Sequence, residues 1–186
     1  MTSQHKILTL ACLTALVLFA LVAIKWKKDA WRKQETRPIH LLPPEMRMEE
    51  VRSISITTKD YAVTLIQNEK EWCIRECGNA PANEQKVLLL LSDLSRAVIT
   101  ERLPDEPPAS LGLDSGAIRI TLNNAEGSPI AQFVFGHRIL RRPPGGEGNL
   151  PDQMVSVARY ILHDGHPAIV ANPFLFLDYT ANQWKK

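Results

Sequence analysis

An uncharged apolar segment near the start of the chain, Ile7 to Ile24, constrains this sequence more than any other feature. Its eighteen residues carry no charge, and its hydroxyl groups are those of Thr9 and Thr14. As an α-helix it would be about 27 Å long, close to the ~30 Å hydrocarbon thickness of a bilayer. The sequence therefore predicts a single transmembrane helix, with the lipid bilayer as its partner.

The residues around this segment favour a retained anchor. Lys25-Trp26-Lys27-Lys28 follows it directly, and lysine stems and indole rings extend a short helix into the headgroup region. A cleaved signal peptide is the alternative, but Leu21-Val22-Ala23 fits the required pattern of small residues poorly. A lipoprotein site at Cys12 is disfavoured because only eleven residues precede it and Thr9 occupies the usual leucine position.

The remainder of the chain divides into a linker and one folded domain. We expect a short tail at residues 1–6, the helix at 7–24, a basic and then proline-containing linker at 25–49, and a globular domain at 50–186. A domain of this length can bury a core without metal ions or disulfides.

Charge is distributed unevenly between these regions. Residues 1–49 contain eight Lys/Arg and four Asp/Glu, a net charge of +4, whereas residues 50–186 contain fourteen and sixteen, a net charge of −2. A nucleic-acid-binding domain should concentrate its basic residues on the folded part, where they can neutralise phosphates. We therefore expect no nucleic-acid partner.

Short runs rich in β-branched residues predict an antiparallel sheet. The first three, separated by tight polar turns, form a meander at Val51 to Thr57, Tyr61 to Ile66 and Glu71 to Ile74. Four further strands are expected near Ala117 to Leu122, Ile130 to Phe135, Met154 to Leu162 and Ala168 to Val170.

A change to helical periodicity between Asn83 and Val98 predicts one helix packed centrally on the sheet. Asn83 is a suitable N-cap residue. The apolar run Val87 to Leu91 makes the apolar face wide, so the helix either lies deep against its own sheet or also docks a partner helix. A short final helix is expected from Phe174 to Tyr179. The predicted fold class is α+β, mostly antiparallel sheet with one central packed helix.

The segment Arg138 to Asp152 is expected to be an irregular loop because it is rich in proline and glycine. Its Gly145-Gly146-Glu147-Gly148 stretch lacks the strand-to-helix setting of a phosphate-binding loop. Arg138, Arg141 and Arg142 form a small basic patch. This patch is either simply solvated or meets an acidic partner.

The histidines at His163 and His166, with Asp164 between them, are the strongest candidates for chemistry. A polar hairpin turn with Gly165 at positive φ explains their spacing. The alternative is part of a metal site, although no further ligands with zinc spacing occur elsewhere in the sequence. The sequence also lacks a Gly-x-Ser-x-Gly nucleophile motif. We expect no catalytic residue, metal, cofactor or small-molecule substrate.

The cysteines do not form a disulfide framework. If Trp72 to Cys77 is one strand, Cys73 and Cys77 share a face but lie about 13 Å apart, beyond the ~7 Å reach of a disulfide. We expect both to be small buried apolar residues. A bend at Gly78 is the alternative that would allow a disulfide or a redox role.

The order of the predicted elements resembles an uncharacterised bacterial domain family, number 4340 among the domains of unknown function, over about residues 51–184. The residues that carry the resemblance are Val51-x-x-Ile54-x-Ile56, Trp72-x-Ile74, the leucine-rich helix Ala82 to Val98, Gly112-Leu113-Asp114, Phe135-Gly136 and Tyr160. It implies one N-terminal anchor in the bacterial inner membrane, a domain outside the cytoplasm, and association with ABC-transport or gliding-motility-type systems. No catalytic residues carry over.

Orientation is the point on which two arguments disagree. The six basic residues between Lys25 and Arg37 would keep the domain in the cytoplasm by the positive-inside rule. The resemblance places the domain on the outer, periplasmic side, and we follow it. The function expected is that of a non-enzymatic accessory or assembly protein. The alternatives are a membrane-bound metal-dependent hydrolase using His163, Asp164 and His166, and a cytoplasm-facing scaffold.

Overall fold

The computed structural model describes residues 39–43, 45–69, 71–142 and 154–186. The predicted transmembrane segment, Ile7 to Ile24, and the glycine-rich stretch 145–148 lie outside these residues. The described residues belong to a compact unit from Ile39 to Lys186. Within them, no helix combines the length and the apolar character that crossing a membrane requires.

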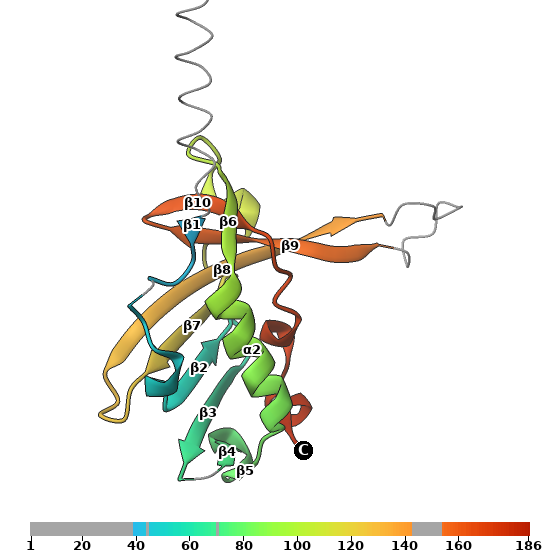
Figure 1. Cartoon of the computed structure of the whole chain (residues 1–186). Helices are drawn as coiled ribbons and strands as arrows, with labels where there is room; N and C mark the ends of the chain where they lie inside the picture. Colours follow the sequence, from blue (N-terminus) through green and yellow to red (C-terminus); the bar gives the residue numbers. More distant parts are fainter. Residues whose placement is uncertain (1–38, 44, 70, 143–153) are drawn as a thin grey trace, which may run out of the picture. The chain divides into compact units, whose positions relative to one another are not determined.

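A single antiparallel sheet organises this unit (Figure 1). Within the described residues it has ten strands, in the order β1-β6-β10-β9-β8-β7-β2-β3-β4-β5. In chain order they are β1 (Ile39–His40), β2 (Ser53–Thr57), β3 (Ala62–Asn68), β4 (Glu71–Ile74), β5 (Ala80–Pro81), β6 (Val98–Arg102), β7 (Ile118–Asn123), β8 (Pro129–Arg141), β9 (Val155–His163) and β10 (His166–Val170). Short 3-10 turns lie at η1 (Met48–Glu50), η2 (Arg75–Cys77), η3 (Pro108–Leu111), η5 (Leu175–Asp178) and η6 (Ala181–Trp184). The predicted β2–β3–β4 meander is confirmed.

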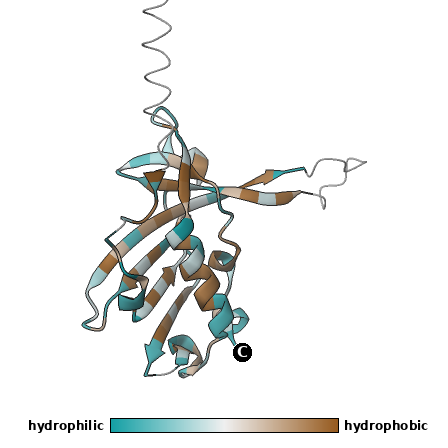
Figure 2. Ribbon diagram, in the orientation of Figure 1, coloured by the Kyte–Doolittle hydropathy of each residue, from teal (hydrophilic) through white to brown (hydrophobic). Residues whose placement is uncertain are grey.

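The two faces of the sheet differ as the alternation of the sequence predicts. On the inner face Ile54 pairs with Leu65, and both are fully buried. On the outer face Ser55 pairs with Thr64, and both retain solvent contact. Figure 2 shows the resulting alternation of apolar and polar residues along these strands. One face of the sheet therefore builds the core while the other meets water.

The helix α2 (Glu84–Arg96) covers the inner face, as predicted. The side chain of Asn83 accepts a hydrogen bond from the amide of Lys86 at 3.2 Å, which confirms the expected N-cap. Four residues are buried against the sheet, namely Val87, Leu90, Leu91 and Leu94. The structure is thus α+β, a mostly antiparallel sheet with one α-helix among the described residues.

The predicted C-terminal end of this helix, Val98, is wrong by two residues, because α2 ends at Arg96. Val98 belongs to β6, because Ala97 adopts an extended backbone with φ −63° and ψ 132°. Val98, Ile99 and Thr100 are all β-branched and suit a strand. Val98 follows Leu94 at the four-residue spacing of a helix face, so the sequence pattern predicts it as helical.

The predicted linker at 25–49 also needs correction, because its last part folds with the domain. Ile39 and His40 form β1, which pairs with Ile99 and Val98 of β6. The next two residues, Leu41 and Leu42, are only 6% exposed. The folded unit therefore begins before the expected boundary at Glu50.

The C-terminal segment closes the core beside α2. The helix predicted from Phe174 to Tyr179 is the 3-10 turn η5, and η6 follows it. Phe174, Leu177 and Trp184 are fully buried. Lys86 of α2 donates a hydrogen bond to the carbonyl oxygen of Gln183 at 2.6 Å and so ties this segment to the helix.

Two glycine-containing motifs that are distant in sequence lie against each other. A Cβ atom on Gly136 of β8 would overlap the carbonyl oxygen of Leu111 and lie 3.1 Å from the side chain of Leu113. Gly112 has φ +70°, and a Cβ atom there would lie 2.7 Å from the ring of His137. The loop at 111–113 therefore rests directly on β8.

The substitution Gly136→Ala is expected to lower the free energy of unfolding by about 2–3 kcal/mol, because backbone must move to admit the methyl group. Gly116→Ala is the matched control, since its nearest neighbour would be Asp114 at 3.8 Å. Chemical denaturation of both variants measures the difference. Equal stability of the two would show that the loop does not press on β8.

Candidate functional site

The strands β8 and β9 continue beyond the rest of the sheet as a two-stranded ribbon. β7 pairs with β8 only as far as Phe135, and β10 pairs with β9 only as far as Arg159. The β8–β9 ladder goes on to the pair Arg141–Val155. Figure 1 shows this ribbon projecting from the side of the sheet. We call residues 138–142 and 154–158 the arm.

The irregular loop predicted from Arg138 to Asp152 is therefore wrong over its first residues. Arg138 to Arg141 are in β8 and pair with residues of β9. The regular backbone here depends on hydrogen bonds to a strand that follows only after residue 153. The proline and glycine residues that suggested a loop begin at Pro143.

Exposed apolar side chains are concentrated on the arm. Leu140, Met154 and Val155 are 48%, 42% and 46% exposed, and they make up three of the six exposed large hydrophobic residues among those described. Such clustering on a projection, rather than scattering over the surface, is typical of an interaction site.

The arm is also basic. Arg138, Arg141 and Arg142 are exposed, and the arm as described contains no acidic residue. The basic patch predicted from the sequence is thus real, but it lies on a strand that also carries apolar side chains. The candidate functional site is this combination of positive charge and exposed apolar surface.

The root of the arm is fixed by an ion pair with a buried partner. Arg159 of β9 is 2% exposed and donates from Nη2 to both carboxylate oxygens of Asp178, at 2.7 and 2.9 Å. Arg138, which pairs with Arg159 across the ladder, has its Nε 3.6 Å from the same carboxylate. Burial lowers the pKa of Arg159, and the attraction of Asp178 opposes that shift. Asp178 thus offsets two like charges on one face of the ribbon.

Tyr61 adds a second contact to the same C-terminal turn. Its hydroxyl donates a hydrogen bond to the carbonyl oxygen of Leu177 at 3.3 Å. Burial, and next the charge of Asp178, raise the pKa of Tyr61 above its ordinary value. Both causes disfavour the phenolate, so the hydroxyl remains a donor at neutral pH.

The histidine turn forms the predicted hairpin between β9 and β10. Asp164 and Gly165 have φ of 50° and 79°, as a tight two-residue turn requires. His163 Nδ1 lies 3.2 Å from the carboxylate of Asp164, whereas His166 is exposed on the other strand. In the described part of the chain, no three His, Cys, Asp or Glu side chains gather closely enough to hold a metal ion.

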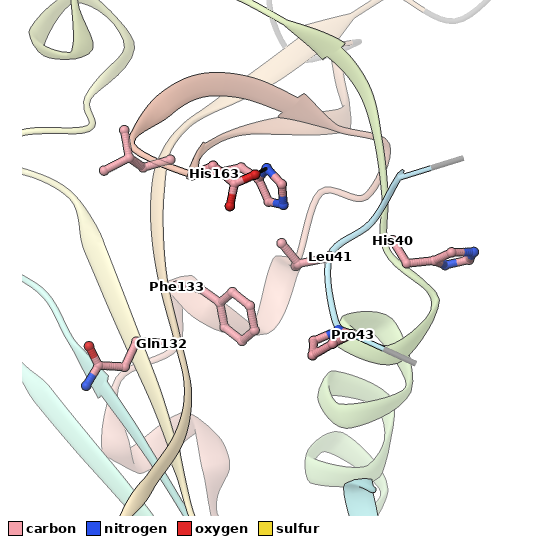
Figure 3. A pocket seen from close by; sticks show the side chains of 8 residues that line it. His40, Leu41, Pro43, Gln132, Phe133 and His163 are labelled. Atoms are coloured by element: carbon pink, nitrogen blue, oxygen red, sulfur yellow. Dashed lines mark ion pairs between the residues drawn. The ribbon is translucent and has the colours of Figure 1, made fainter. Parts of the chain in front are cut away.

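A pocket of about 390 Å³ lies beside this turn (Figure 3). Its lining residues are His40, Leu41, Pro43, Gln132, Phe133, Leu162, His163 and Asp164. The imidazole of His40 points away from His163, on the far side of its strand. The two imidazoles therefore do not converge, and Leu41 and Phe133 give the pocket an apolar wall.

The two cysteines of the domain occupy different elements. β4 ends at Ile74, so Cys73 lies in the strand and Cys77 in the turn η2. The single strand assumed for Trp72 to Cys77 is therefore wrong. Both thiols are free, with Cys73 buried and Cys77 half-buried.

The apolar face of α2 is only partly used by the core. Leu88 and Leu89 are each 52% exposed. Leu88 borders a groove of about 530 Å³ between α2 and the segment around Met48 and Arg52. The sequence-based alternative that α2 also docks a partner helix stays a prediction.

Comparisons with protein-family models, with curated proteins and with solved structures found no match. The resemblance to domain family 4340 stays a prediction that depends on the order of its motifs. Two of these motifs, Gly112-Leu113-Asp114 and Phe135-Gly136, contact each other in the structure.

Removing Asp178 should lower the free energy of unfolding more than removing its partner Arg159. Asp178→Asn leaves a buried guanidinium without its counter-charge and is expected to cost about 2–4 kcal/mol of stability. Arg159→Met removes the buried charge and leaves a carboxylate that is 35% exposed and can be solvated, so we expect about 1–2 kcal/mol. Urea denaturation of both variants tests the order, and a larger loss for Arg159→Met would contradict this assignment.

The raised pKa of Tyr61 predicts a loss of stability in alkali. A tyrosine whose folded pKa lies above its unfolded value of about 10 favours folding fully below that pH, and the contribution disappears as the pH rises through the folded pKa. The Tm of the wild type should therefore fall more between pH 9 and 11 than that of Tyr61→Phe. Parallel curves for the two proteins would rule out this coupling.

Proposed function

We propose that this chain is a single-pass protein of the bacterial inner membrane, anchored by Ile7 to Ile24. Its α+β domain serves outside the cytoplasm as a non-enzymatic accessory or assembly subunit of a membrane complex, of ABC-transport or related type. The lipid bilayer is one partner, and subunits of the complex are the others.

The observation that carries the proposal is the arm. It combines three exposed large apolar residues with three exposed arginines on a two-stranded projection. A free-standing monomer gains nothing from such a surface, because apolar side chains held in water cost free energy without adding to the core. Contact with another protein removes that cost.

The anchor supports the same proposal. The length of the uncharged segment suits a bilayer, and its basic and tryptophan-containing flank suits the headgroup region. A tethered domain meets neighbouring membrane proteins at high effective concentration, so a small surface such as the arm is enough for association.

A cytoplasm-facing scaffold is the second candidate, and the basic residues between Lys25 and Arg37 favour it. A metal-dependent hydrolase has weaker support. A half-buried His163 and an exposed Asp164 form a single pair at the turn, and His166 does not line the adjacent pocket.

The anchor and the orientation can be tested with one tagged strain. We expect a chain with a C-terminal tag to stay in the membrane pellet after alkaline carbonate extraction, and protease added to spheroplasts to remove the tag. Release into the soluble fraction would overturn the anchor. A tag that is cleaved only after lysis would instead support the cytoplasm-facing scaffold.

Assembly is tested by photo-crosslinking from the arm in cells. A benzophenone amino acid at position 140 should form adducts with other membrane-complex subunits. The same amino acid at position 119, an exposed residue of β7, is the matched control. Adducts of equal yield and composition at both positions would show that the arm is not an assembly surface.

A further inference from the structure

We infer that the outer edge of the arm's β8 strand is a strand-addition site for an extended, acidic segment of a partner protein. This deepens the proposed function and rests on it, because it assigns the chemistry of the partner at the assembly surface. Three features of the arm support this inference: its open backbone edges, its positive charge and the pattern of its exposed side chains.

Among the described strands, none besides β8 and β9 pairs with the arm on either side. β8 has β7 as its outer neighbour only up to Phe135, and the ladder between them ends there. From Arg138 to Arg141 the partner of β8 is β9 alone, as far as the described residues show. An isolated two-stranded ribbon is only marginally stable, whereas a third strand satisfies a further row of backbone groups. Strand addition is the binding mode that uses such an edge.

The fold limits where the added strand can begin. The loop at 111–113 rests on Gly136, and Gly112 lies under the ring of His137. The loop therefore lies against β8 at Gly136 and His137, the last two residues before the arm. The available edge therefore starts at Arg138 and runs towards Arg142.

The charge of the arm selects an acidic occupant. Asp178 already engages Arg138 and Arg159, whereas Arg141 and Arg142 have no ion-pair partner among the residues described. A second copy of this chain added edge to edge would place arginine beside arginine. Like charges on neighbouring strands are unfavourable, and carboxylates in those places are favourable.

The register of the arm defines the pattern that fits. Leu140 pairs with Ser156, and Arg141 pairs with Val155. Residues paired across a ladder share a face, and successive residues point to opposite faces. Arg141 therefore shares its face with Val155, and Leu140 shares the opposite face with Arg142. Each face carries an arginine beside an apolar side chain, so the third strand that fits has both acidic and apolar residues on each face.

The open edge also disfavours insertion of the arm into lipid. Backbone groups without partners cost several kcal/mol each in the hydrocarbon region. The same groups are satisfied when a peptide strand binds. Exposed leucine, methionine and valine on this arm therefore fit a protein partner better than the bilayer interior.

The test uses the purified full chain in a neutral detergent and a dye-labelled ten-residue peptide of repeated Glu-Glu-Val-Val, which places Glu and Val on both faces of a strand. We expect fluorescence anisotropy to give a Kd at least tenfold lower for this peptide than for one of repeated Lys-Lys-Val-Val. N-methylation of alternate amides, which removes the donors on one edge, should raise the Kd at least tenfold. Equal binding of the three peptides would overturn the proposal.

Variants assign the binding to the arm. The double variant Arg141→Glu and Arg142→Glu should weaken binding of the Glu–Val peptide at least tenfold. Arg119→Glu, a charge reversal on the outer face of β7, should leave it unchanged. Unchanged far-UV circular dichroism and Tm confirm that both proteins are folded. A loss of binding with Arg119→Glu alone would move the site away from the arm.

Crosslinking also distinguishes two other occupants of the arm, the lipid bilayer and a second copy of this chain. Crosslinking from position 140 to lipid in phosphatidylglycerol nanodiscs would overturn the proposal in favour of a membrane contact, and crosslinking only to this chain would favour a homo-oligomer. If the peptides bind equally but position 140 still forms adducts with another subunit in cells, strand addition is wrong and the proposed function is still supported. If alkaline carbonate releases the chain from membranes but the chain still binds the peptide, the strand-addition site is supported and the proposed membrane role is wrong.

Discussion

The buried guanidinium of Arg159 is the interaction on which most of the domain depends. A charge taken out of water needs a counter-charge at close range, and Asp178 supplies it at 2.7 Å. Asp178 lies in η5, so the C-terminal segment must stay in place for the pair to form. That segment also brings Phe174 and Leu177 into the core. One ion pair thus links the long β8–β9 ribbon, the core and the end of the chain.

A steric constraint on β8 complements this electrostatic one. Contact between Gly136 and the loop at 111–113 leaves no room for a side chain, and the β8–β9 register shifts between Phe135 and Arg138. Beyond this point β9 is the partner of β8 in the part of the chain that the structure describes. The arm is a consequence of this change in pairing, and its exposed apolar and basic residues follow from the lack of a third described strand.

The proposed function joins this arm to the predicted anchor. A membrane tether restricts diffusion to two dimensions and raises the effective concentration of neighbouring partners. A short strand-addition site then suffices, since affinity does not have to come from a large interface. The rest of the domain positions the arm.

Periodicity in the sequence determined the central part of the fold. Local side-chain alternation predicted β2, β3, β4, β7 and the inner part of β8, and the 3.6-residue period with Asn83 predicted α2, because both signals depend on near neighbours in the chain. Only the tertiary structure decided that Ile39 and His40 form a strand, that Val98 leaves the helix, and that Arg138 to Arg141 extend β8. These elements depend on backbone hydrogen bonds to segments distant in sequence, and a local pattern carries no information about such partners. The sequence alone identified the arginines of the candidate site. That they lie on an open strand edge could be seen only in the tertiary structure.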